Sequence, residues 1–422
     1  MTDVPSQQGV TRVVIVGAGQ AGSEAAVALR QAGHEGPITL LGNEPHPPYR
    51  RPPLSKDYLA GKSRHEDLYV KPVEAYAKLL IDFHPRRQVV ELDRASKRVS
   101  LDDGESLSYD KLILATGGRP RRLELAGSDA PNVHYIRTID DIDGLRAAFL
   151  PGTRMVIIGA GYIGLETAAV AIQHGLDVTV LETAERVLAR VAAVELSTFY
   201  ESIHTTRGVK LHTSTTVLGL ELDRDHRVRQ VLTNKGPIEV DVLVVGIGLI
   251  PNTELAVAAG LDVDGAITTD EFTRTSDPDI LAIGDCTSHP NAFYGKRLRL
   301  ESVQNALEQA RTAAATIMGQ VKPYNPVPWF WSDQYELKLQ MVGLSQGHDR
   351  TVIRGAMADN SFAVFYLHGS HIIAVDAVNR PQDFLLAKRL VAARIKCEPG
   401  QLADVAFPLK SLFESAVSQT QE

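Results

Sequence analysis

Two glycine-rich stretches of nearly identical sequence constrain this chain more than any other feature. They read TRVVIVGAGQAG from Thr11 and TRMVIIGAGYIG from Thr153. Each has an apolar run before G-x-G-x-x-G and an amphipathic run after it, which predicts a strand, a tight turn and a helix. The glycines permit the turn, the approach of a pyrophosphate to the backbone, and close packing of helix on strand. The copies lie too far apart for a solenoid repeat. We interpret them as two mononucleotide-binding units, against the alternatives of plain turns or of one working site and one relic.

Composition excludes several classes of protein. The chain has 422 residues, 44% hydrophobic and 23% charged, which is typical of a globular protein of about three domains. Its net charge of −7 argues against nucleic acid as a general partner. The N-terminus lacks the pattern of a signal peptide, and no apolar run is long enough for a membrane helix. The two cysteines, Cys286 and Cys397, have neither a C-x-x-C nor a metal-ligand spacing. We therefore expect a cytoplasmic protein without a bound metal.

The first three quarters of the chain alternate short β-branched runs with longer amphipathic ones. This order is typical of an α/β protein with parallel sheets. We predict strands at 12–16, 38–41, 111–115, 155–158, 178–181, 242–245 and 280–283, and helices at 21–32, 163–174, 194–207 and 302–318.

The sequence pattern changes after a proline-dense linker at 322–328. Short alternating runs follow, which predict antiparallel strands at 339–343, 351–355, 362–367 and 372–378 and a helix at 381–393. We expect a third domain of α+β type from about Pro323 onward.

Polar residues follow several of the predicted strands. Glu182 comes directly after the strand at 178–181, at about the position where an acid holds the ribose of NADH and repels the 2′-phosphate of NADPH. The matching place after the first loop holds Asn43 and Glu44, and either could take that role. Arg186 and Arg190, just beyond Glu182, could soften the preference for NADH, although a solvated helix face is the simpler interpretation.

Asp285 lies two residues after the apolar strand predicted at 280–283, at the carboxyl end of that strand, where ligands bind in open α/β folds. Alone it would be more typical of a helix cap. Together with the two glycine loops it becomes a candidate to bind the ribityl chain of a flavin.

Several further motifs accompany these loops, namely YRRPPLSK at 49–56, ATGGRP at 115–120, GIGLIPN at 246–252 and WFWSDQ at 329–334. With them the chain resembles the oxygenase-coupled NADH–ferredoxin reductases, which belong to the two-dinucleotide-binding flavoproteins with a glutathione-reductase-like fold. The resemblance implies two Rossmann-like domains and a C-terminal α+β interface domain. The FAD domain would be discontinuous, at 1–117 and 246–322, with the NAD domain at 118–245 and the interface domain at 323–422.

The resemblance also carries over the cofactor contacts. For FAD they are Gly17, Gly19, Gln20, Ala21, Gly22, Asn43, Glu44, Arg51, Lys56, Val89, Ala115, Thr116, Gly117, Arg137, Gly284, Asp285, Glu301, Ser302, Val303 and Trp331. For NADH they are Gly159, Gly161, Tyr162, Ile163, Gly164, Glu182 and Gly248, and Glu301 is a candidate contact for either cofactor. Asn43 departs from the carboxylate that the family more often has.

The disulfide reductases of the superfamily carry a redox-active cysteine pair, which this chain lacks. We expect Cys286 to be buried packing and electrons to leave directly from the flavin. Lys56 and Glu166 are predicted to form an ion pair beside the flavin ring, where the ammonium stabilises the reduced, anionic form. The plainer alternatives are a surface lysine and a carboxylate favoured by the helix dipole.

The implied partner is a 2Fe-2S ferredoxin that feeds a haem-thiolate monooxygenase or a ring-hydroxylating dioxygenase. Since such partners are usually acidic, as this chain is, a local basic patch must bring them together. The candidates are Lys296, Arg297, Arg299, Arg311 and Lys410, each of which is individually an ordinary solvated charge. The pattern does not separate a monomer from a homodimer. Alternatives are an NADH oxidase, a rubredoxin or nitrite reductase component, and an interaction protein of the apoptosis-inducing-factor type.

Overall fold

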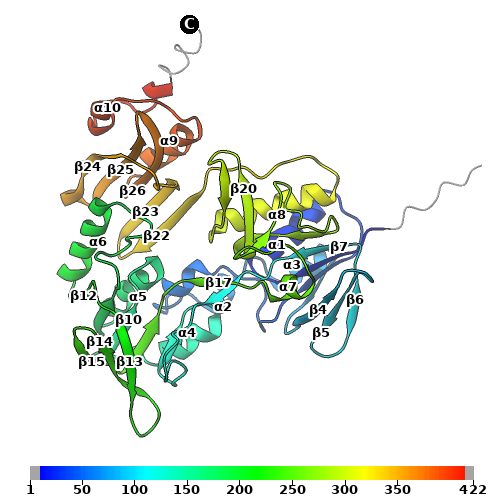
Figure 1. The fold of residues 1–422 in the computed structure, drawn as a ribbon, viewed down its shortest axis with the longest axis horizontal. Helices are drawn as coiled ribbons and strands as arrows, with labels where there is room; N and C mark the ends of the chain where they lie inside the picture. Colours follow the sequence, from blue (N-terminus) through cyan, green and yellow to red (C-terminus); the bar gives the residue numbers. More distant parts are fainter. Residues whose placement is uncertain (1–9, 414–422) are drawn as a thin grey trace, which may run out of the picture. The chain divides into compact units, whose positions relative to one another are not determined.

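The computed structural model describes residues 10–413, which divide into two compact units (Figure 1). The first unit comprises 10–51, 65–119 and 250–326, and the second comprises 52–64, 120–249 and 327–413. Each unit is therefore assembled from three separate segments of the chain. Within the described residues, no helix combines the length and the hydropathy that crossing a membrane requires.

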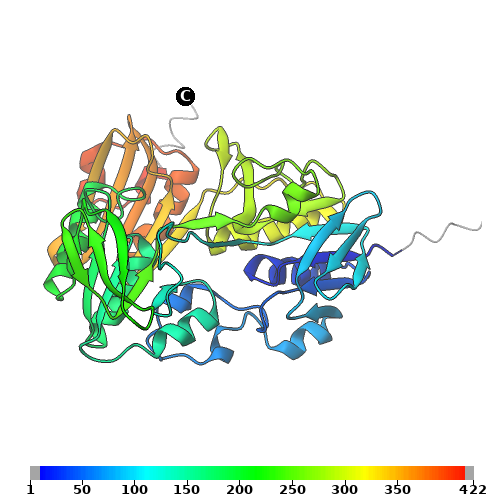
Figure 2. The same ribbon diagram turned by 60° about the horizontal axis from the view of Figure 1, so that its bottom comes forward.

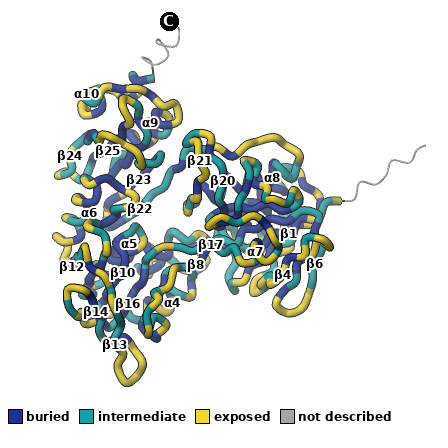
Figure 3. The backbone as a smooth tube through the Cα atoms, in the orientation of Figure 1, coloured by how far each residue is buried: buried dark blue, intermediate teal, exposed yellow. Residues whose placement is uncertain are grey.

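A parallel five-stranded sheet forms the centre of the first unit. Its order is β19-β7-β1-β2-β3, with β1 at Val13–Val16, β2 at Ile38–Leu41, β3 at Ile81–His84, β7 at Lys111–Leu114 and β19 at Ile280–Ala282. All four residues of β1 are buried, as expected of a parallel strand covered on both faces (Figure 3). One face packs on α1 (Gln20–Gln31) and α8 (Val303–Ile317), which contact each other, and α3 (Val73–Lys78) lies beside β3.

Smaller elements complete the first unit. An antiparallel sheet of β4 (Val89–Asp93), β5 (Arg98–Leu101) and β6 (Ser106–Ser108) covers the other face with α7 (Glu254–Ala258). A second small sheet has the order β18-β20-β21, at Ile267–Thr268, Thr287–Asn291 and Lys296–Leu298. The short helices α2 (His65–Leu68) and η2 (Gly284–Cys286) also belong here.

The second unit also contains a parallel five-stranded sheet, of order β12-β11-β10-β16-β9. The strands are β9 at Val133–Tyr135, β10 at Arg154–Ile158, β11 at Asp177–Leu181, β12 at Lys210–His212 and β16 at Val242–Val245. Its helices are α4 (Ile139–Arg146), α5 (Tyr162–Gln173) and α6 (Val194–Thr206), and an antiparallel sheet of β13 (Val217–Leu222), β14 (Val228–Thr233) and β15 (Gly236–Glu239) adds to its core.

The C-terminal part of the second unit is an antiparallel sheet of order β22-β23-β26-β25-β24. The strands lie at Trp329–Gln334, Leu337–Gly343, His371–Val378, Ser361–His368 and Arg350–Ala356, in that order, and η3 (Met357–Asp359) joins β24 to β25. Helix α9 (Pro381–Ala392) packs on β26 and β23, and α10 (Pro399–Ala403) packs on β24 (Figure 2). Strand β22 and the short helix η1 (Pro52–Ser55) both contact α5.

The predicted α/β class, with two parallel sheets and a C-terminal antiparallel domain, is confirmed. Each predicted strand and helix is present, with ends that differ by at most two residues. The sequence patterns did not indicate β3, β9, β12 or any of the three three-stranded sheets, because most of these strands are short and partly exposed and lack clear alternation. Strands β8 (Gly118–Pro120) and β17 (Leu249–Pro251) lie where the chain passes between the units. The division into three domains at 117, 245 and 322 stays a proposal.

One buried arginine holds the C-terminal segment onto the sheet. Arg354 on β24 is 4% exposed, and its guanidinium lies 3.4 Å from Asp383 Oδ2. It donates at 2.5 to 3.2 Å to four backbone carbonyls, those of Leu402, Asp404, Val405 and Phe407. A single side chain therefore supplies the hydrogen-bond donors for four carbonyls of this segment.

Arg354→Leu should therefore lower the free energy of unfolding by roughly 3–5 kcal/mol, since it leaves four carbonyls without their donor and removes one of the two arginines that pair with Asp383. Urea unfolding followed by circular dichroism would measure the change. The matched control is Arg350→Leu, at the exposed start of the same strand, which should change stability by less than about 0.5 kcal/mol. Equal effects of the two substitutions would contradict the assigned role.

Candidate functional site

The first glycine loop joins β1 to α1 and shows why three glycines stand there. Gly17 has a φ of +111°, and a Cβ on it would lie 2.2 Å from the carbonyl oxygen of Ala115. A Cβ on Gly22 would lie 1.9 Å from the carbonyl oxygen of Gly17. Gly19 is different, because a Cβ there would have nothing within 4 Å and its φ of −83° suits any residue. The described residues therefore leave open space beside Gly19.

The second loop, between β10 and α5, repeats this geometry. A Cβ on Gly159 would lie 2.4 Å from the carbonyl oxygen of Gly246, and one on Gly164 would lie 2.0 Å from that of Gly159. Gly161 again has nothing within 4 Å. Neither α1 nor α5 has an acidic residue in its first turn or a side-chain cap. Both helix N-termini thus present free backbone N–H groups, which suit a pyrophosphate.

Glu182 lies against the second loop. Its Oε2 accepts a hydrogen bond from the Ala160 backbone N–H at 2.8 Å, and its Oε1 accepts one from that of Ala184 at 2.9 Å. The carboxylate is therefore held at the loop, where the sequence predicts a ribose contact. That contact stays a prediction.

The predicted ribose position of the first loop has a different environment. Glu44 accepts from the Tyr49 hydroxyl and from the Arg51 guanidinium, each at 2.5 Å, while Asn43 is exposed. Burial acts to lower the pKa of Arg51, but the neighbouring Tyr49, Glu44 and Asp285 raise it overall. Arg51 is thus a fixed positive charge that Glu44 partly neutralises. Whether Asn43 or Glu44 binds the ribose stays open.

Other predicted FAD contacts gather around the first loop. Gly284 has a φ of +81°, and a Cβ on it would lie 3.1 Å from Ala21 Cβ, which brings Asp285 next to the start of α1. Thr116 donates to the Asn252 carbonyl at 2.7 Å, and the Asn252 amide donates back to the Thr116 carbonyl at 2.9 Å. The structure therefore brings the first loop, 115–117 and 284–285 together in the first unit.

The remaining FAD candidates are more scattered. Ser302 caps α8 by accepting from the Asn305 backbone N–H at 3.1 Å, and Val303 begins that helix. Val89 begins β4, and Arg137 precedes α4 in the second unit. Lys56 and Trp331 also belong to the second unit. Their assignment to the flavin rests on the sequence resemblance alone.

Lys56 and Glu166 form an ion pair within the second unit. Lys56 Nζ lies 2.7 Å from Glu166 Oε2, with the lysine 16% and the glutamate 3% exposed. Glu166 lies beyond the first turn of α5, so the helix dipole does not account for it. Two serines also donate to the carboxylate, Ser55 to Oε2 at 2.5 Å and Ser332 to Oε1 at 2.6 Å. Neither serine was predicted as a site residue, although they lie inside the RPPLSK and WFWSDQ motifs.

The two tryptophans lie on one face of β22, as their spacing predicts. The ring centroids of Trp329 and Trp331 are 5.8 Å apart, and Lys388 Nζ lies 4.6 Å from the Trp329 centroid. The intervening Phe330 lies on the opposite face, with its centroid 5.3 Å from that of Tyr162 in the second glycine loop. Strand β22 therefore has two distinct faces, of which one packs on α5.

The predicted basic patch has less free charge than its sequence suggests. Arg299 pairs with Glu301, and Arg311 pairs with Glu24 at 2.8 Å. Arg297 donates to the Thr269 carbonyl at 2.8 Å. Lys296 on β21 and Lys410 near the C-terminal end of the second unit are exposed. Their role in docking stays a prediction.

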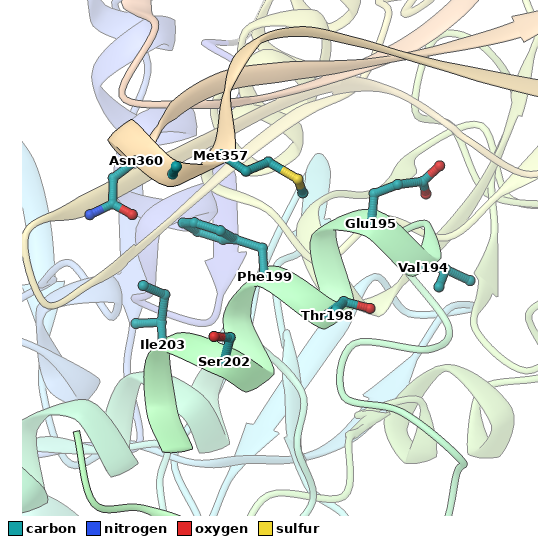
Figure 4. A pocket seen from close by; sticks show the side chains of 9 residues that line it. Val194, Glu195, Thr198, Phe199, Ser202, Ile203, Met357 and Asn360 are labelled. Carbon is teal, nitrogen blue, oxygen red and sulfur yellow. The ribbon is translucent and has the colours of Figure 1, made fainter. Parts of the chain in front are cut away.

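A separate cavity of about 680 Å³ lies between α6 and the segment around η3 (Figure 4). It is lined by Val194, Glu195, Thr198, Phe199, Ser202, Ile203, Met357, Ala358 and Asn360. None of the predicted cofactor or catalytic residues is among them, and most of the lining is apolar.

Neither cysteine is joined in a disulfide. Cys286 and Cys397 are both buried and free, and burial raises the pKa of each thiol, that of Cys397 to about 11. The prediction that Cys286 is buried packing is confirmed. Among residues 10–413 no group of histidine, cysteine and acidic side chains could hold a metal ion.

Comparison with known proteins agrees with this geometry. Residues 11–310 match the family model of pyridine nucleotide-disulphide oxidoreductases, and residues 329–413 match the model of the reductase C-terminal domain. The chain belongs to the pyridine nucleotide-disulphide oxidoreductase family. Despite the family name, it carries no pair of neighbouring cysteines that could form a redox disulfide.

Members of this family resemble the chain over nearly its whole length. Putidaredoxin reductase of Pseudomonas putida is 47% identical, over 96% of this chain and 98% of that protein. Rhodocoxin reductase of Rhodococcus erythropolis is 45% identical, over 94% and 93% respectively. The structure also superposes, with a TM-score of 0.93, on a chain of the covalent putidaredoxin reductase–putidaredoxin complex. That chain is 47% identical, and the match covers 99% of it and 96% of this one.

The open glycines give a matched pair of substitutions in the second loop. Gly161→Ala should cost about 1 kcal/mol of stability or less, yet raise the KM for NADH at least about tenfold because a methyl group would occupy the space for the pyrophosphate. Gly164→Ala should instead destabilise the protein strongly, since its Cβ would meet a backbone carbonyl at 2.0 Å.

Thermal unfolding and steady-state kinetics distinguish the two effects, with retained flavin colour as the measure of folding. If Gly161→Ala leaves the KM unchanged, the second loop does not bind the nucleotide.

Proposed function

We propose that this protein is an FAD-dependent NADH–ferredoxin reductase. It takes hydride from NADH and passes single electrons to a 2Fe-2S ferredoxin that supplies a bacterial oxygenase. The observation that carries the proposal is the identity of 41–47% across nearly the whole chain to reductases that include putidaredoxin reductase and the ferredoxin–NAD⁺ reductase component of an anthranilate 1,2-dioxygenase system. The match spans the C-terminal domain as well as both glycine loops.

The residues fit both nucleotides. Gly19 leaves room beside an uncapped helix N-terminus, and the buried Gln20 Oε1 has no hydrogen-bond partner among the described residues. This loop, with Arg51 and Asp285, would hold FAD, and the second loop with Glu182 would hold NADH. A bound flavin accepts two electrons as hydride and releases them one at a time.

The side chains of the proposed site act through charge and position. Lys56 would supply a positive charge where negative charge develops during hydride transfer. Glu166 holds the ammonium group through the 2.7 Å contact, and the surrounding burial excludes water that would screen the pair. Trp331 would cover the reacting ring.

The state of the two cysteines bears on how electrons leave the protein. Since both thiols are buried, unpaired and far apart in sequence, electrons leave without a dithiol step. Partner docking would use the exposed Lys296 and Lys410 with Arg297, Arg299 and Arg311, although acidic neighbours compensate Arg299 and Arg311. The free cysteines also support a cytoplasmic location.

The direct test is spectroscopic and then kinetic. The purified protein should be yellow, its flavin absorbance should bleach with NADH under anaerobic conditions, and it should reduce at least one member of a panel of purified 2Fe-2S ferredoxins. A colourless folded protein would exclude the proposal. Fast hydrogen peroxide formation with slow reduction of every ferredoxin would favour the alternative, an NADH oxidase on the same fold.

The choice of nucleotide depends on Glu182. We expect Glu182→Ala to raise the KM for NADH about tenfold and to change that for NADPH less, because the ribose contact and the repulsion of a 2′-phosphate disappear together. Steady-state ferricyanide reduction with each nucleotide measures this. The exposed neighbour Glu185 provides the control, and Glu185→Ala should change neither value. An equal change of both KM values in Glu182→Ala would refute the role.

A further inference from the structure

A network of hydrogen-bonded polar side chains extends from Glu166 through the C-terminal sheet. It begins with Ser332, whose hydroxyl donates to Glu166 Oε1 at 2.6 Å. Gln334, two residues on and on the same face of β22, donates through Nε2 to Ser332 Oγ at 3.3 Å. Ser332 and Gln334 are fully buried. The face of β22 that packs on α5 thus carries two polar side chains where apolar residues would be ordinary.

The network continues to α6. His204 Nε2 lies 2.9 Å from Gln334 Oε1, and its Nδ1 lies 2.9 Å from the Tyr335 hydroxyl. Since Gln334 already donates to Ser332 through its amide nitrogen, its oxygen must accept from His204, which assigns the Nε2–H tautomer. Tyr335 then donates to Nδ1. Arg207 lies over the Tyr335 ring, 4.1 Å from its centroid, and pairs with Glu336 near the surface.

Every hydrogen bond in this network is donated in the direction of Glu166. Tyr335 donates to His204, His204 to Gln334, Gln334 to Ser332, and Ser332 to the carboxylate. Burial lowers the pKa of His204 to about 4, with a further lowering by Arg207, although the bond to Gln334 opposes it. The imidazole is therefore neutral near pH 7, as the assigned tautomer requires. Aligned donors that end on an ionised acceptor strengthen one another.

Packing alone does not explain these residues. Partly satisfied polar groups in a core are costly, and an apolar core of the same volume is usually at least as stable. The network ends on the carboxylate that pairs with Lys56. Without Ser332, Glu166 Oε1 would lose the donor that the described residues supply.

We propose that Ser332, Gln334 and His204 are positioning residues, which hold the Glu166 carboxylate and through it the Lys56 ammonium group in the geometry that hydride transfer needs. The C-terminal sheet thereby has a second role besides meeting a partner, because it determines the orientation of the ion pair. The inference rests on the proposed function and names residues that act through Glu166 without touching a cofactor.

The kinetic test is anaerobic stopped-flow reduction of the flavin by NADH. Ser332→Ala should slow the limiting rate of reduction about tenfold, while the dissociation constant of NADH stays within about twofold of wild type. Ser332→Thr keeps the hydroxyl and should restore most of the rate. Ser361→Ala, at the start of β25 in the same sheet, is the matched control and should match wild type.

A thermal double-mutant cycle gives a readout independent of activity. Ser332→Ala should lower the Tm by several degrees in the wild-type background, and by much less when Glu166 is replaced by leucine, because the acceptor is already gone. If Glu166→Leu does not fold, Glu166→Gln should show the same non-additivity at smaller size, since it turns a charge-assisted bond into a neutral one. Ser361→Ala should be additive with either substitution.

The outcomes separate the inference from the proposed function. If the wild-type flavin is not reduced by NADH, the proposed function fails. If wild type is reduced, but Ser332→Ala is reduced equally fast or is additive with the Glu166 substitution, the inference alone fails. Should Ser332→Ala not fold, Gln334→Met replaces it, with about a threefold slowing expected at unchanged NADH affinity. A rate equal to wild type in that variant would overturn the inference as well.

Discussion

The buried carboxylate of Glu166 joins three segments of the second unit. Glu166 is 3% exposed, and its two oxygens accept from three donors on two other segments of the chain. Ser55 and Lys56 come from 52–64, and Ser332 comes from the C-terminal sheet. An ionised group in such a place requires all of these partners, since an unpaired buried charge would cost several kcal/mol. The requirement helps explain why three segments distant in sequence form one compact unit.

The duplicated glycine loops have different electrostatic surroundings. In the second loop Glu182 accepts from two backbone N–H groups, which carry no full positive charge. In the first, Glu44 is compensated by Arg51, whose charge Asp285 also favours. The proposed FAD and NADH sites would thus share one turn geometry and differ in the charges around it.

Surface charge would limit how this protein meets an acidic ferredoxin. The net charge is −7, and two of the five predicted docking cations already lie beside a carboxylate. Such compensated arginines can still donate hydrogen bonds, but they add little long-range attraction. Exposed lysines would then contribute most of the steering, which makes association sensitive to ionic strength.

The sequence alone determined the strand–turn–helix order of both nucleotide-binding units, the acid after β11 and the lack of a dithiol, because periodicity, glycine spacing and residue counts are local properties. It also placed Trp329 and Trp331 on one face of a strand. Only the tertiary structure decided that Ser55 and Ser332 share one carboxylate, that His204 reaches Gln334, and that Arg354 holds four carbonyls of the C-terminal segment. These contacts join segments that are far apart in the chain, and no local pattern encodes which distant donor a buried acceptor will meet.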